Sequence, residues 1–211
     1  MIITIANAKG GVAKTTSAIY LACAASKDDQ QVTVLDADIQ SSASLWADTA
    51  ETETPLPFRV DAANLSTFNR LHPSAADWVI VDAAPADKIM TAAIGVSDFV
   101  IIPTSDSPMD LQQVWAMISA IPEDTPTAVL IAKAQPRTTA FHETVEALKG
   151  QGVMTLEEHK EAGTIANVMR FSTAIPLRQD IKKALGTTPP HLYEYTELYL
   201  ETLQIKEYLG L

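Results

Sequence analysis

The chain has 211 residues, of which 47% are hydrophobic and 19% are charged. That balance is typical of an ordinary globular protein, and the length favours one domain with a sizeable core. The formal net charge of −11 argues against a uniformly basic nucleic-acid surface. No apolar run approaches the roughly 20 residues that cross a bilayer. The single cysteine, Cys23, excludes a disulfide framework within one chain, and the N-terminus lacks the features of a signal peptide. We therefore expect a cytoplasmic protein.

The most informative stretch is the run Lys-Gly-Gly-Val-Ala-Lys-Thr-Thr at residues 9–16. It follows an apolar, strand-like run over residues 1–6 and opens a helix-like run over residues 16–25. In a strand–turn–helix context, backbone N–H groups can surround an anion and the helix N-terminus adds partial positive charge. We expect Lys14 to reach the β- and γ-phosphates of a nucleotide and the Thr15 hydroxyl to ligate Mg²⁺.

The spacing differs from the general phosphate-loop pattern G-x-x-x-x-G-K-[ST] at one position, where Ala13 replaces the second glycine. A second lysine, Lys9, precedes the glycine pair. The run resembles the deviant Walker A motif of the ParA/MinD family of ATPases. The resemblance implies that Lys9 crosses a dimer interface to the partner's nucleotide. It also implies that the loop itself binds ATP through Gly10, Gly11, Val12, Ala13, Lys14, Thr15 and Thr16. A turn that only joins a strand to a helix is the structural alternative.

Acidic residues follow two further apolar runs, residues 31–36 and 77–82, which we expect to be buried strands. Carboxylates at the carboxyl ends of parallel strands face the crevice where ligands bind. The segment beginning at Asp36 is similar to the family's D-x-D-P-Q sequence, with Ile39 in place of proline. This implies that Asp36 supports the Mg²⁺ shell and that Asp38 orients the attacking water. Either residue could instead cap the helix that begins near Ser41. Asp82 looks like the Walker B acid, which holds a water on Mg²⁺.

The rest of the chain continues to alternate between the two element types. We expect strands at residues 57–61, 97–103 and 126–132, and helices at residues 62–71, 139–150 and 193–209. A further helix should begin near Pro108. The segment over residues 97–110 resembles the small plasmid-type members of the family, in which it lines the dimer interface. For the last strand, residues 164–169 are favoured over 153–156. Lys133 follows a strand where the family often contacts the base, and we expect it to touch the nucleotide.

Basic residues gather only in the C-terminal third, at Arg170, Arg178, Lys182 and Lys183. The last three fit one helix face, and we predict that all four bind DNA once a dimer brings two such sets together. The alternative is an ordinary solvated helix face. The closing helix is mainly acidic, with Lys206 as its one basic residue. A membrane anchor would need several lysines and arginines there, so no membrane partner is expected.

The alternating elements predict an α/β fold: three layers with a mostly parallel sheet covered on both faces, as in P-loop NTPases. The resemblance implies a short ParA-type partition ATPase that hydrolyses ATP with Mg²⁺, weakly and under stimulation by its partner. It further implies an ATP-dependent sandwich homodimer, non-specific DNA binding on the nucleoid, and a centromere-binding, ParB-like partner. The cargo, a plasmid, a chromosome or a protein cluster, stays open.

Three other protein classes share the phosphate loop. A MinD-like ATPase would carry a basic amphipathic C-terminus, and an iron-protein ATPase would need bridging cysteines; the chain offers neither. A dethiobiotin-synthetase-like ligase would phosphorylate a small carboxylate. It is the main alternative, and its turnover would depend on a small substrate and not on DNA.

Overall fold

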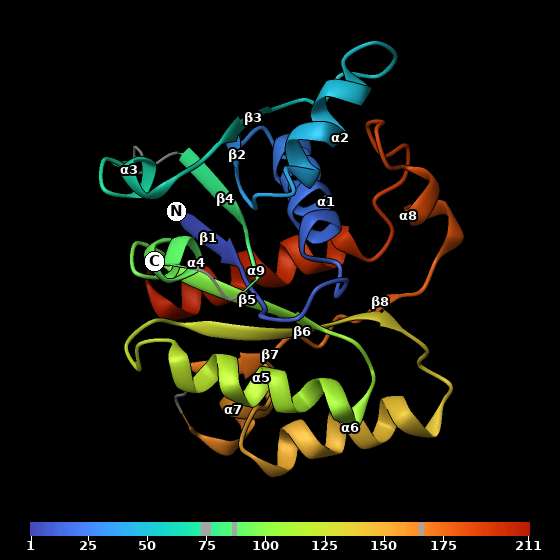
Figure 1. Cartoon of the computed structure of the whole chain (residues 1–211). Coiled ribbons are helices and arrows are strands. Elements are labelled where there is room, and N and C mark those ends of the chain that lie inside the picture. Colours follow the sequence, from blue (N-terminus) through green and yellow to red (C-terminus); the bar gives the residue numbers. More distant parts are fainter. Residues whose placement is uncertain (73–76, 86–87, 165–166) are drawn as a thin grey trace.

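The structure, a computed structural model, describes residues 1–72, 77–85, 88–164 and 167–211 (Figure 1). The strands are β1 (Ile2–Ile5), β2 (Gln31–Ala37), β3 (Arg59–Ala62), β4 (Asp77–Ala83), β5 (Phe99–Thr104), β6 (Thr127–Ala134), β7 (Val168–Arg170) and β8 (Ile175–Pro176). The helices are α1 (Lys14–Lys27), α2 (Ser42–Ala50), α3 (Leu65–Phe68), α4 (Lys88–Ile94), α5 (Pro108–Ala120), α6 (Thr139–Gly150), α7 (Leu156–Ala162), α8 (Gln179–Lys183) and α9 (Tyr195–Leu209).

The strands form one sheet in the order β3-β2-β4-β1-β5-β6-β7, and β8 pairs with β6. Every described pairing is parallel. Successive residues of β5 are buried on opposite faces: Phe99 and Ile101 join one hydrophobic cluster, while Val100 and Ile102 join another. A strand buried on both faces needs a continuous apolar run, which explains why these segments were recognisable in the sequence. The predicted α/β fold with a mostly parallel sheet is confirmed.

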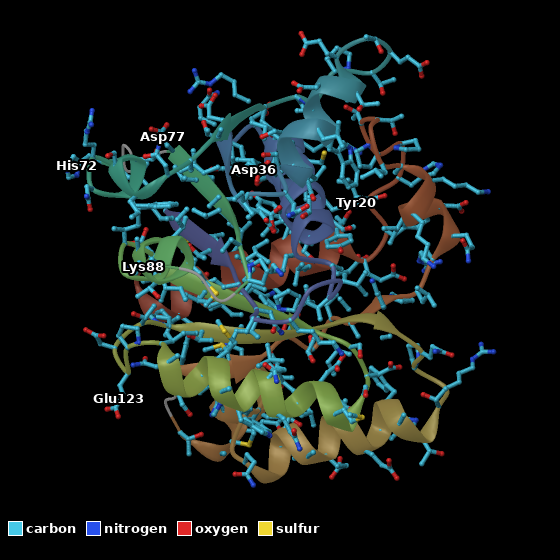
Figure 2. All side chains as sticks on the ribbon, in the orientation of Figure 1. Tyr20, Asp36, His72, Asp77, Lys88 and Glu123 are labelled. Carbon is cyan, nitrogen blue, oxygen red and sulfur yellow. The ribbon has the colours of Figure 1, made fainter. Side chains whose placement is uncertain are left out.

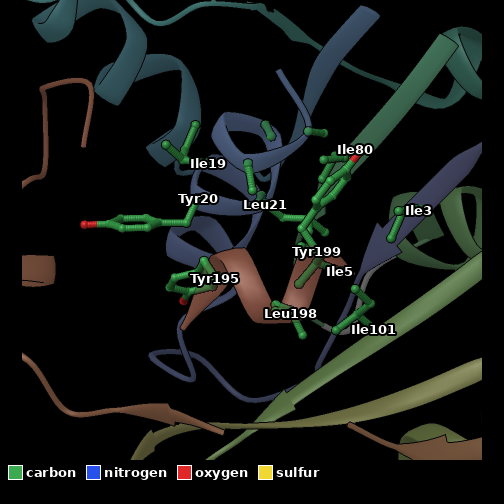
Figure 3. Close-up of a cluster of buried hydrophobic side chains, with 14 of the residues drawn as sticks. Ile3, Ile5, Ile19, Tyr20, Leu21, Ile80, Ile101, Tyr195, Leu198 and Tyr199 are labelled. Carbon is green, nitrogen blue, oxygen red and sulfur yellow. The ribbon is translucent and has the colours of Figure 1, made fainter. Parts of the chain in front are cut away.

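The largest part of the core lies between the sheet and the helices α1 and α9. Figure 3 shows Ile3, Ile5 and Ile101 of the sheet facing Leu198 of α9. Tyr20 of α1 packs against Tyr195 of α9, with ring centroids 4.7 Å apart. On the other face, α4 and α5 supply buried residues such as Met90 and Val114. The first and last helices of the chain therefore hold the same side of the sheet (Figure 1).

Most predicted elements are present, but two expectations need correction. The helix expected over residues 62–71 is limited to the four-residue α3, which begins after Asn64, whose side chain accepts from the Ser66 and Thr67 N–H groups. The strand expected over residues 164–169 is the three-residue β7, which overlaps that segment only at its end; residues 165–166 lie outside the described residues. The two-residue β8 was not expected. No helix within the described residues is long and apolar enough to span a bilayer.

Candidate functional site at the carboxyl edge of the sheet

The loop between β1 and α1 has the backbone geometry of an anion-binding turn. Gly11 adopts φ +75°, and Ala13, the residue before α1, adopts φ 71°. A left-handed conformation suits glycine and is costly for other residues, which explains why the general pattern has glycine at the Ala13 position. No side chain caps the N-terminus of α1. The first N–H groups of the helix are therefore available to a ligand at the loop.

Two lysines from different elements, α1 and β6, contact carbonyl groups of the loop. The Lys14 ammonium donates to the Lys9 carbonyl over 3.1 Å, and the Lys133 ammonium donates to the Gly11 carbonyl. Burial lowers the pKa of Lys14, while the charges of Asp82 and Asp38 oppose that effect. Both ammonium groups donate hydrogen bonds to carbonyl oxygens of the loop. The oxygens of a bound phosphate could replace these carbonyl oxygens as acceptors. The structure thus places Lys133 against the phosphate loop, whereas the sequence predicted it near the base; its contact with the nucleotide stays a prediction.

Asp82, the last polar residue of β4, is the most unusual group at this edge. Its side chain is buried, and neither carboxylate oxygen accepts a well-formed hydrogen bond from the described residues, although the Thr15 hydroxyl lies near. Burial raises the pKa of Asp82 to about 7, although the Thr15 hydroxyl and Lys14 lower it in part. A buried carboxylate without a partner is costly. An Mg²⁺ ion, or a water bound to it, would satisfy both oxygens. The Asp82 and Thr15 oxygens therefore fit the ion expected there.

Asp36 lies beside Asp82, because the two residues are register partners on the adjacent strands β2 and β4. One Asp36 oxygen accepts hydrogen bonds from the N–H and the hydroxyl of Ser44, each 2.7 Å long. Figure 2 shows Asp36 in the interior near α2. Asp36 thus anchors the first turn of α2, which is the helix-capping role that the sequence left open for it. This role does not prevent Asp36 from orienting water around a metal ion. Asp38 is only partly buried and accepts from the Gln40 N–H over 2.9 Å.

Lys9 leaves the loop on the side of α5. Its N–H donates to the Asn7 side chain over 2.8 Å, and its ammonium group forms an ion pair with Asp110. Asn7 in turn donates to the Pro103 carbonyl over 2.8 Å. Neither Asn7 nor Asp110 was recognisable as a functional residue from the sequence. The one signal for Asp110 was its place in the segment 97–110, which resembles the dimer-interface segment of the small plasmid-type members of the family.

A small cavity of about 60 Å³ lies between the phosphate loop and α8. Ala13 and Thr16 form one wall, and Lys133, Arg178 and Lys182 contribute to the others. It also has apolar walls from Ile175 and Ile181. The cavity continues from the phosphate loop toward the C-terminal third, so it extends the site in the direction in which a nucleoside attached to bound phosphates can lie.

The four basic residues of the C-terminal third do not form one surface. Arg170 is buried on β7 and pairs with Glu158 over 3.0 Å. Arg178 precedes α8 instead of lying within it and forms an ion pair with Glu194. Only Lys182 and Lys183 lie exposed on α8, and Figure 1 shows that helix far from β7. Glu158 and Glu194 balance the charges of the two arginines. Because these partners lie elsewhere in the sequence, the positions of the basic residues alone could not predict the pairing.

Comparison with known proteins agrees with this geometry. Residues 3–186 match the family described as the CobQ/CobB/MinD/ParA nucleotide binding domain. The chain belongs to this family. It is also 31% identical over 165 residues to the Maintenance of carboxysome distribution protein A of Gloeobacter kilaueensis, with 74% of each chain covered. The family assignment suggested by the deviant Walker A resemblance is confirmed.

Two solved structures share the fold. A putative plasmid partition protein of Borrelia burgdorferi, bound to AMPPNP, has a TM-score of 0.67 at 20% identity, with 98% of each chain covered. The cobyrinic acid a,c-diamide synthase of Mycobacterium smegmatis, with ADP and magnesium, also has a TM-score of 0.67, at 16% identity, over 100% of this chain and 96% of the other. At these identities the likeness shows the fold alone. The fold therefore occurs in both a partition protein and a biosynthetic enzyme.

Proposed function

We propose that the protein is an ATP-binding and ATP-hydrolysing partition or positioning ATPase. The observation that carries this proposal is the pairing of a phosphate loop with a buried, unpartnered carboxylate. Lys14 and the N-terminus of α1 present positive charge on one side, and Asp82 presents its free oxygens on the other. Triphosphate with Mg²⁺ complements both halves, because the phosphates neutralise the lysine and the ion satisfies the acid.

Hydrolysis of the γ-phosphate needs positioning and charge neutralisation more than covalent chemistry. Lys14 holds the β- and γ-phosphates, and Lys9 from a second subunit adds charge as the leaving group departs. Asp38, partly buried at the edge of the site, orients the attacking water. Thr15 would hold Mg²⁺, Asp36 and Asp82 would support its waters, and the ion would supply charge that neutralises the phosphate oxygens. The nucleoside occupies the side of the loop where Lys133 and the small cavity lie.

A homodimer formed with ATP would bring two α8 helices together for non-specific DNA binding. Lys182 and Lys183 are the exposed cations on each helix, and affinity for a polyanion rises steeply with the number of phosphates neutralised. Arg178 can assist only if DNA competes with Glu194, and Arg170 is too deeply buried to take part. The proposed DNA surface is thus smaller than the basic residues in the sequence suggested.

The structure provides a physical link between the nucleotide site and α8. Asp36 fixes the start of α2, and Trp46 of α2 donates its ring N–H to the Thr187 carbonyl over 2.8 Å. Gly186, at φ +78°, lies so close to α2 that a Cβ there would come within 2.6 Å of a Thr49 methyl carbon. A shift of α2 on nucleotide binding would therefore move the segment that follows α8. This link supports DNA binding that responds to ATP.

The partner would be a centromere-binding, ParB-like adaptor that stimulates hydrolysis. The cargo can be a plasmid, a chromosome or a protein assembly, since the similar proteins include a plasmid partition protein and one named for carboxysome distribution. The neighbouring open reading frame is the first candidate to test as the adaptor.

A second candidate function is an ATP-dependent ligase or kinase for a small carboxylate, because the same fold also occurs in a biosynthetic enzyme, the cobyrinic acid a,c-diamide synthase. ATP turnover distinguishes the two. We expect slow turnover that DNA and the adaptor together accelerate, and that small carboxylic acids leave unchanged. Turnover that requires a small carboxylic acid and ignores DNA would establish the ligase function instead. The Lys14→Ala variant is the control for contaminating ATPases.

A further inference from the structure

Lys9 is held within its own subunit by a carboxylate that is built into α5. The Lys9 side chain is 47% exposed, whereas the Asp110 side chain that it contacts is only 8% exposed. The second Asp110 oxygen accepts a hydrogen bond from the Ser105 hydroxyl over 2.6 Å. A half-exposed cation thus pairs with a nearly buried anion that a second hydrogen bond holds in place.

The position of Asp110 alone does not explain this ion pair. An acid in the first turn of a helix is stabilised by the helix dipole without any lysine. Burial raises the pKa of Asp110, but the hydrogen bonds from Lys9 and Ser105 outweigh it, so the pKa is lowered overall. The carboxylate is therefore charged at neutral pH and competes for the Lys9 ammonium group with any other anion that approaches it.

We propose that Asp110 is a positioning residue that retains Lys9 in its own subunit until the triphosphate of a second subunit displaces it. The inference rests on the proposed ATP-dependent dimer, in which Lys9 must reach the partner's nucleotide. Each dimer then requires two Lys9–Asp110 pairs to break, once in each subunit. The γ-phosphate of ATP carries more negative charge than a carboxylate and can win this competition. ADP lacks that phosphate, so the pair persists and the protein stays monomeric.

The Asp110→Asn variant tests the proposal. The amide keeps the size of the side chain and can still accept the Ser105 hydrogen bond, but it no longer carries the charge that attracts Lys9. Dimerisation is measured by sedimentation velocity with the slowly hydrolysed analogue AMPPNP over a range of protein concentrations. Because two pairs no longer need to break, we expect half-dimerisation at a roughly tenfold lower protein concentration than in the wild type. Equal or weaker dimerisation of Asp110→Asn would overturn the proposal.

The Asp106→Asn variant is the matched control. It removes one negative charge from the same loop, where Asp106 accepts from the Gln135 N–H and does not contact Lys9. A similar gain in this control would attribute the effect to reduced repulsion and defeat the inference. Thermal unfolding must show that Asp110→Asn is folded. If it is not, Ser105→Ala replaces it: this variant removes only the hydrogen bond from the Ser105 hydroxyl to Asp110, and it should give a smaller gain in dimerisation. A wild type that never dimerises with AMPPNP would defeat the proposed dimer itself, together with the inference, whereas a dimerising wild type isolates the role of Asp110.

Discussion

Buried charges occur in two regions of the molecule, and they are satisfied differently in each. In the C-terminal third, Arg170 pairs with Glu158 through one terminal nitrogen and lacks a partner among the described residues only at Nε. The Glu201 carboxylate accepts from the Ser172 and Thr173 N–H groups, so both of its oxygens are paired. At the carboxyl edge of the sheet, the buried Asp82 accepts no well-formed hydrogen bond from the described residues. Buried groups with internal partners stabilise a fold, whereas a buried group without one indicates a missing ligand. This contrast supports the carboxyl edge as the place where a ligand binds, whereas the paired charges of Arg170, Arg178 and Glu201 in the C-terminal third stabilise the fold.

The largest expected effect concerns Asp38. Asp38→Ala should reduce ATP turnover at least about a hundredfold, the scale of losing a positioned polar group that acts on water. ATP affinity should stay near the wild-type value, because Lys14 and the loop remain intact. Phosphate release and titration with a fluorescent ATP analogue measure the two quantities. Asp48→Ala, which removes an exposed acid from α2, is the control. Wild-type turnover in Asp38→Ala would move the water-orienting role to another residue.

The second prediction tests the only part of the C-terminal third that we assign to function. Lys182→Glu/Lys183→Glu should weaken ATP-dependent DNA binding by roughly fiftyfold, because four charges per dimer change sign. Lys27→Glu/Lys160→Glu reverses two other exposed lysines and should have little effect. Gel shifts with a non-specific duplex compare them. Since Lys182 borders the cavity beside the loop, ATP affinity is measured in parallel. Unchanged DNA binding would show that α8 is an ordinary solvated helix.

Lys14→Ala removes a charge-assisted contact to the β- and γ-phosphates. Such contacts are worth about 1.5–3 kcal/mol, so ATP affinity should fall roughly tenfold or more. Lys183→Ala removes the same type of charge from α8 and should leave the ATP affinity unchanged. Comparing the two variants in the same titration shows which of the two regions binds ATP. Equal affinities for Lys14→Ala and the wild type would refute the phosphate-loop assignment.

The last expected effect concerns stability: a pH-dependent gain from Asp82→Asn in the nucleotide-free protein. The pKa of Asp82 is raised from 3.8 to about 7, so the folded protein binds a proton there that the unfolded chain releases. The free energy of unfolding therefore falls as the pH rises from about 4 to about 7. Asparagine does not titrate and avoids this loss. We expect its advantage at pH 8 to exceed that at pH 5 by roughly 2–3 kcal/mol, because about two pH units of this loss lie between the two values.

Denaturant unfolding without nucleotide or Mg²⁺ measures this difference, with Asp48→Asn as the exposed control. The same Asp82→Asn variant should bind ATP less tightly than the wild type only when Mg²⁺ is present. A gain that is equal at both pH values would show that Asp82 is not held in its neutral form.

The elements that the sequence predicted correctly are those whose patterns depend on nearby chain neighbours. The glycine-bearing turn, the helix after it and the acid at the end of an apolar strand are local patterns, and β1, α1 and β4 follow them closely. The ion pairs of Arg170 and Arg178 depend on residues 12 and 16 positions away in sequence. Lys9 and Asp110 are 101 positions apart. Such long-range pairing follows from the packing of helices on the sheet, so composition and spacing could not predict it.

The most direct test of the central claim, that nucleotide at the carboxyl edge controls DNA binding, is a comparison of DNA affinity with ATP and with ADP. Filter binding with a non-specific duplex at low salt should show at least about tenfold tighter binding with ATP, and this binding should be lost above roughly 200 mM salt. Equal DNA affinity with ATP, with ADP and without nucleotide would contradict the claim.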